Sequence, residues 1–115
     1  ANTNLENLIK THQRNGTKVI VNGKLPDDKN KAKALFEIIR EAVTNAIKHA
    51  NSTEIYVDIV NEIGTVSMQI TNNGKIPTKN ITENDGMKGM KRKVAELGGE
   101  IHFETIPRFL IKIHL

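Results

Sequence analysis

Residues 36–50 have the sequence FEIIREAVTNAIKHA, and this stretch decides how the rest of the chain is interpreted. Apolar residues from position 35 onward recur at the three-to-four spacing of a helix and share one broad face; they are Leu35, Ile38, Ile39, Ala42, Val43, Ala46 and Ile47. Upstream lie Asp27 and Asp28, and acidic side chains suit the positive end of a helix dipole. The pattern therefore predicts a long helix that starts within residues 25–28, runs to about residue 50 and ends at Asn51-Ser52.

The same helix carries a polar stripe beside its apolar face. Glu37, Glu41, Asn45 and Lys48 stack along it at about 100° per residue, with His49 at its flank. An asparagine oxygen is a hard ligand suited to Mg²⁺, and lysine or histidine can contact phosphate oxygens. The stripe can thus hold a metal-bound phosphate. An ordinary solvated helix face is the alternative interpretation.

On either side of this helix the sequence alternates between further helix and strand patterns. Residues 4–13 and 87–97 have helical periodicity, and the predicted strands are residues 17–21, 54–61, 65–71, 100–105 and 109–115. The order is helix, strand, helix, two strands, loop, helix, two strands. It predicts one α/β domain over residues 1–115, a two-layer sandwich with the helices on one face of a mixed sheet.

Two glycine-containing segments flank the polar stretch of residues 72–86. Asn72-Asn73-Gly74 follows a predicted strand, where α/β folds commonly place ligands. Gly86-Met87-Lys88-Gly89 opens a predicted helix, whose free N–H groups can bind an anion. Taken alone, an open loop and a flexible helix cap account for them equally well. Their order after the polar stripe favours a phosphate site.

Composition excludes several other classes of protein. The 115 residues include no cysteine, which excludes disulfides and thiolate metal sites, and the four histidines form no zinc-binding cluster. No apolar run approaches the roughly 20 residues that span a bilayer, and no signal peptide is visible. The net charge is +4, but the lysines are scattered and few aromatic residues are present for base stacking. We therefore expect no nucleic-acid partner.

Both motifs resemble the catalytic ATP-binding domain of sensor histidine kinases, within the wider GHKL ATPase superfamily. Residues 36–50 are similar to the N box of that family, and residues 86–99 (GMKGMKRKVAELGG) to its second glycine box. The resemblance covers nearly the whole chain. The GMxxxVxxLGG ending at residues 89–99 suggests the subfamily that signals to response regulators with LuxR-type output domains.

The resemblance implies the Bergerat fold, an α/β sandwich with a mixed, mainly antiparallel sheet. It implies that Asn45 ligates Mg²⁺ and that Glu41 beside it is catalytic, positioning the water shell of the metal or the transferring phosphoryl group. Residues 75–86 correspond to the ATP lid. The implied ATP-binding residues are Asn45, Lys48, His49, Asn72, Gly74, Gly86, Met87 and Gly89.

By the same resemblance, the domain donates the γ-phosphoryl group of Mg-ATP to a histidine on a separate dimerisation domain, and a cognate response regulator is the downstream partner. The fragment is expected to be monomeric. The parent protein is expected to be a homodimer, anchored in the membrane with this domain in the cytoplasm.

Three departures from the family pattern leave a second hypothesis open. Asn72 stands where the family has an Asp that accepts from the adenine amino group, although the amide oxygen of Asn72 can still accept. Ile76-Pro77 and Asn84 replace expected glycines, and Arg108-Phe109 replaces a Gly-Thr pair. The chain is accordingly either an active kinase domain or a degenerate module that kept the fold and acts by docking to other proteins.

Overall fold

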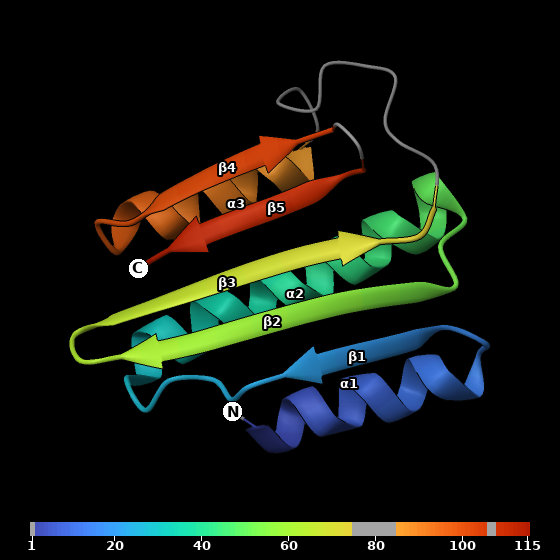
Figure 1. Cartoon of the computed structure of the whole chain (residues 1–115), viewed down its shortest axis with the longest axis horizontal. Coiled ribbons are helices and arrows are strands. Elements are labelled where there is room, and N and C mark those ends of the chain that lie inside the picture. Colours follow the sequence, from blue (N-terminus) through green and yellow to red (C-terminus); the bar gives the residue numbers. More distant parts are fainter. Residues whose placement is uncertain (1, 75–84, 106–107) are drawn as a thin grey trace.

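The computed structural model describes residues 2–74, 85–105 and 108–115 (Figure 1). Its helices and strands follow in the predicted order: α1 (Asn2–Arg14), β1 (Lys18–Asn22), α2 (Lys29–Ala50), β2 (Glu54–Glu62), β3 (Thr65–Asn72), α3 (Asp85–Glu96), β4 (Glu100–Glu104) and β5 (Leu110–His114). The expected lid, residues 75–86, lies mostly outside the described residues.

The five strands form one mixed sheet in the order β1-β2-β3-β5-β4. β1 and β2 pair in parallel, because α2 crosses between them, whereas the β2–β3, β3–β5 and β4–β5 pairs are antiparallel. The β2–β3 hairpin keeps one register from Glu62↔Thr65 to Ile55↔Asn72. The expected mixed, mainly antiparallel sheet is therefore confirmed.

The helices bury one face of this sheet. Side chains along β2 and β3 alternate between buried and more exposed, as expected for a sheet with one covered face. The buried apolar residues of α2, the strands and α3 form one core cluster, which also contains Leu5 of α1. In Figure 1, α2 and α3 cross behind the strands and α1 runs beside β1. The predicted two-layer sandwich is confirmed.

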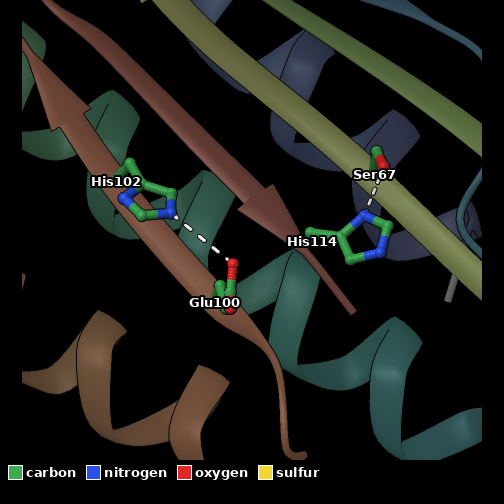
Figure 2. A network of polar contacts seen from close by, with 4 residues as sticks. All are labelled: Ser67, Glu100, His102 and His114. Atoms are coloured by element: carbon green, nitrogen blue, oxygen red, sulfur yellow. Dashed lines mark hydrogen bonds and ion pairs between the residues drawn. The ribbon is translucent and has the colours of Figure 1, made fainter.

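The opposite face of the sheet is mainly polar, although it also exposes Ile20 and Val60. Figure 2 shows His114 of β5 with Nδ1 2.9 Å from Ser67 Oγ of β3, and His102 of β4 with Nε2 3.7 Å from Glu100 Oε2. Lys112 Nζ lies 2.9 Å from Glu104 Oε2 on the same face. These groups are substantially exposed, so their ion pairs contribute little to stability.

Both ends of α2 have local signals that explain its bounds. Asp28 is the N-cap, with its Oδ1 accepting from Lys31 N–H at 3.0 Å, so the helix begins at the end of the predicted window. At the other end Asn51 adopts the left-handed conformation, and Ser52 N–H donates to Ala46 O at 3.0 Å. This turn leads the chain directly from α2 into β2. Among the described residues, no helix is both long and apolar enough to cross a membrane.

Candidate functional site

The fold brings three of the predicted segments to one end of the molecule. β2 starts just after the end of α2, and its Ile55 pairs with Asn72 at the end of β3. α2 packs against both β3 and α3. The C-terminal half of the polar stripe, the end of β3 and the beginning of α3 therefore surround one region (Figure 1).

Asn72 faces the helices rather than solvent. It follows the buried Ile70 by two positions along β3, so its side chain lies on the covered face, and it is 7% exposed. Its Oδ1 accepts two hydrogen bonds, from Ser52 Oγ–H at 3.0 Å and from Gly74 N–H at 3.0 Å. A backbone N–H can only donate, so the amide atom beside Gly74 must be the oxygen. Both lone pairs of Asn72 Oδ1 are thereby used within the protein.

Asn73, one position further on, is exposed and links two strands through its side chain. Its Oδ1 accepts from the backbone N–H groups of Thr53 and Glu54, each at 3.0 Å, and its Nδ2 donates to Thr53 Oγ1 at 2.9 Å. The side chain thus joins the beginning of β2 to the end of β3 by hydrogen bonds. Neither these bonds nor the bond from the buried Ser52 to Asn72 was predicted, because each pairs residues about 20 positions apart in the chain.

The side-chain nitrogen of Asn45 is buried. Within the described parts of the chain, Asn45 Nδ2 has no hydrogen-bond partner. Such a group costs about 1–3 kcal/mol, and in a native structure it calls for an explanation such as an absent ligand or water. Glu41, one turn earlier on α2, is half-buried. Two polar side chains of the predicted stripe therefore face a part of the structure that is not fully solvated.

Asn45 and Glu41 suit a magnesium ion that binds together with a phosphate-containing ligand. Among the described residues, no three histidine or acidic side chains gather as a metal site of their own. Mg²⁺ typically takes only one or two protein ligands and completes its shell with water and substrate phosphates. The half-buried amide of Asn45 and carboxylate of Glu41 supply oxygen ligands of that kind.

Gly89 of α3 has no internal reason to be glycine. Among the described residues, a Cβ added there would meet only Lys93 Nζ, at 3.9 Å, and φ of Gly89 lies outside the positive region. By contrast, a Cβ at Gly99 would lie 2.5 Å from His114 O. Since glycine weakens a helix interior, a glycine facing open space is consistent with the close approach of a ligand.

The remaining predicted residues are placed less informatively. Lys48 is exposed on α2, and His49 is in its last turn with a side chain outside the described part. Gly86 lies in the first turn of α3, and Met87 beside it is 6% exposed. Glu37, which is not among the implied binding residues, has its Oε2 3.9 Å from Arg40 Nη2. This ion pair lies at the surface and contributes little to stability.

A separate hollow lies at the other end of α2. It has a volume of about 470 Å³ and lies between the start of that helix and the β2–β3 turn, lined among others by Lys31, Asn61 and Thr65. A helix of 22 residues is about 33 Å long, so the hollow and Ser52 are widely separated. None of the predicted site residues lines it.

Known proteins resemble this chain in sequence over part of its length. Over 75 residues, 64% of this chain, it is 29% identical to the sensor protein VraS of Staphylococcus haemolyticus and to that of Staphylococcus aureus. The chain spans about a fifth of these relatives, since the match covers 22% of each.

Solved structures show the same fold over nearly the whole chain. The histidine kinase domain of a blue-light activated histidine kinase from Erythrobacter litoralis has a TM-score of 0.76 at 20% identity, over 96% of this chain and 56% of that one. The ATP binding domain of PrrB from Mycobacterium tuberculosis has a TM-score of 0.72 at 18% identity, over 93% of this chain and 86% of that one. The expected fold class is thus confirmed.

The family itself is shown by the sequence. Residues 30–115 match the histidine kinase-, DNA gyrase B-, and HSP90-like ATPases, a stretch that contains the polar stripe of α2, the end of β3 and all of α3. Because this match covers well over half of the chain, the chain belongs to the histidine kinase-, DNA gyrase B-, and HSP90-like ATPase family.

Proposed function

We propose that this chain is the nucleotide-binding catalytic domain of a sensor histidine kinase. In this proposal residues 1–115 form a single domain that binds Mg-ATP and donates its γ-phosphoryl group to a histidine on a separate dimerisation domain. The family match and the likeness to VraS sensor proteins support it. The observation that carries the nucleotide site is the buried Asn45 Nδ2, which has no partner among the described residues and can donate to a phosphate oxygen, beside the half-buried Glu41.

Each residue of the site then has a physical role. Asn45 would hold Mg²⁺, which neutralises phosphate charge during phosphoryl transfer. Glu41 orders the surrounding water or the transferring group, and Lys48 and His49 contribute positive charge. Gly86 and Gly89 admit phosphates close to the backbone at the beginning of α3, where the helix dipole favours an anion. Asn72, Gly74 and Met87 complete the nucleotide site.

The whole protein would act as a two-component sensor. The partners in this proposal are the dimerisation domain of the same kinase and a cognate response regulator, with a LuxR-type output domain according to the ending of residues 89–99. The fragment is monomeric, whereas the parent is a homodimer. The parent is anchored in the membrane and this domain is cytoplasmic.

Asn72 supports the second candidate, a docking module that has lost nucleotide binding. The amide carries no negative charge, and its oxygen already accepts two internal hydrogen bonds. A charge-assisted hydrogen bond is about twice as strong as a neutral one, so its loss weakens binding of an adenine nucleotide. The intact stripe of α2 favours the kinase instead, because a docking module has no need of a buried unpaired amide.

Calorimetric titration with a non-hydrolysable Mg-ATP analogue tests the proposal. We expect saturable binding that requires Mg²⁺ and is lost in Asn45→Ala. Arg40→Ala is the matched control on the same helix, because Arg40 is exposed and its side chain contacts Glu37 and the ring of Phe36 in the described structure. Magnesium-independent binding, or equal binding by Asn45→Ala, would remove Asn45 from the site. Absence of binding would favour the docking module.

A further inference from the structure

We propose that Asn72 reverses the purine preference of the nucleotide site, so that the site favours an oxopurine base (hypoxanthine or guanine) over adenine. The inference rests on the proposed function, because it takes the base of the nucleotide to lie against Asn72. It identifies the class of purine that the site selects.

The hydrogen-bonding direction of Asn72 is set from inside the protein. Ser52 Oγ–H and Gly74 N–H both donate to Asn72 Oδ1, at 3.0 Å each. An amide oxygen has two lone pairs, and these two donors use both. The oxygen is therefore not free to accept from a ligand, and within the described residues the group that Asn72 has left to offer is its Nδ2, which only donates.

Rotating the amide by half a turn does not restore an acceptor. The rotation would place Nδ2 against Gly74 N–H, so that two donors would face each other in a site where Asn72 is 7% exposed. Ser52 can adapt because a hydroxyl both donates and accepts, but a backbone N–H cannot. Gly74 thus fixes the orientation of the amide, and Ser52 strengthens it.

The two classes of purine differ in what they present to such a donor. Adenine carries an exocyclic amino group, which donates, whereas guanine carries a carbonyl oxygen at the same ring position, which accepts; hypoxanthine carries the same carbonyl. Asn72 Nδ2 opposite the amino group would leave two donors facing each other. Opposite the carbonyl it forms a hydrogen bond. A carboxylate at residue 72 has four acceptor sites, so it would keep two for the protein and still accept from adenine.

The test compares two ligands on two proteins. Non-hydrolysable Mg-ITP and Mg-ATP analogues, which differ at the purine, are titrated calorimetrically into the 115-residue chain and into Asn72→Asp. We expect the native chain to bind the ITP analogue about 5-fold to 150-fold more tightly, the range expected when one buried hydrogen-bonding group is left unpaired. Asn72→Asp is expected to reverse the order.

Asn73→Asp is the matched control, because it adds the same charge one residue away. Its two acceptor bonds to Thr53 N–H and Glu54 N–H are retained, and its side chain lies outside the proposed site. The ratio of the two affinities should stay as in the native chain. Ser52→Ala tests the positioning residue. Because this substitution frees one lone pair of Asn72 Oδ1 to accept from adenine, we expect a smaller ratio between the affinities for the ITP analogue and the ATP analogue.

The outcomes separate this inference from the proposed function. Tighter binding of the ATP analogue by the native chain, or a ratio unchanged in Asn72→Asp, would overturn the inference and leave the nucleotide site standing. Binding of the ATP analogue by Asn72→Asp alone would also overturn it, because the native amide would then recognise neither base. Absence of binding by both proteins would overturn the proposed function and the inference with it.

Discussion

Replacing Gly89 by alanine should stabilise the domain and weaken its binding of nucleotide. Gly89 is the fifth residue of α3, its backbone is not in the positive-φ region, and in the described part of the chain an added Cβ would meet only Lys93 Nζ, at 3.9 Å. That separation is an ordinary van der Waals contact. Alanine is about 0.8–1.0 kcal/mol more favourable than glycine in a helix interior, so the free energy of unfolding should rise by about that amount.

The expected rise in melting temperature is about 4 °C for a domain of this size. Thermal unfolding followed by circular dichroism measures it, and titration with a non-hydrolysable Mg-nucleotide analogue measures binding on the same samples. Binding should weaken, because the added methyl group occupies the space through which phosphates approach the helix in the proposed site.

Gly98→Ala is the matched control for this substitution. An added Cβ at Gly98 meets no atom of the described residues within 4 Å, but φ there is +71°, so alanine is strained. We expect Gly98→Ala to lower the melting temperature and to leave the affinity for nucleotide unchanged. If Gly89→Ala destabilised the chain, or bound nucleotide as tightly as the native chain, the reasoning that assigns open space at Gly89 to a ligand would be refuted.

Three further predictions concern other parts of the molecule. Asn45→Ala should keep a free energy of unfolding equal to or above the native value, since it removes a buried donor without a partner in the described structure; chemical denaturation measures this, and a loss of several kcal/mol would contradict it. Asp28→Ala should cost about 1 kcal/mol in the same assay, because the N-cap bond to the backbone of α2 is lost, while nucleotide affinity at the far end of the helix stays unchanged. The hydrogen bond to Glu54 raises the pKa of Tyr56. This hydrogen bond therefore stabilises the fold at pH values below the ordinary tyrosine pKa, and the stabilisation is lost as pH rises through the raised pKa of Tyr56. Because the chain has one tyrosine and no tryptophan, the tyrosinate absorbance reports this residue alone, and Glu54→Gln should lower its midpoint; an unchanged midpoint would exclude Glu54 as the cause.

The sequence predicts the elements well because each has a strong local signal. The strict alternation in residues 65–71 and the helical spacing of residues 36–47 leave little ambiguity, and β3 and α2 occupy these ranges. The start of α3 is predicted at Met87 and lies at Asp85, two residues earlier. Helix ends fray and carry weak local preferences, so errors of this size are expected there.

The order of the strands and the polar contacts of the site have no comparable local signal. Nothing near β5 in the sequence predicts that it lies between β3 and β4. The expectation that Asn72 accepts through its oxygen could not include Ser52, 20 positions away, whose hydroxyl uses one lone pair of that oxygen. The unpaired amide of Asn45 also depends on what surrounds it in the folded chain. The sequence indicated which side chains can bind a nucleotide, but it could not indicate which of their polar atoms are already hydrogen-bonded in the folded chain.

Two-dimensional amide NMR of the labelled chain, with and without a non-hydrolysable Mg-nucleotide analogue, tests the location of the site most directly. We predict that the shifted resonances belong to the end of α2, to Asn72 and Gly74, and to the first turns of α3, while Lys31 and Thr65 at the 470 Å³ hollow stay unchanged. Shifts confined to the hollow, or saturating ligand without any shift, would contradict a nucleotide site built on Asn45, Asn72 and Gly89.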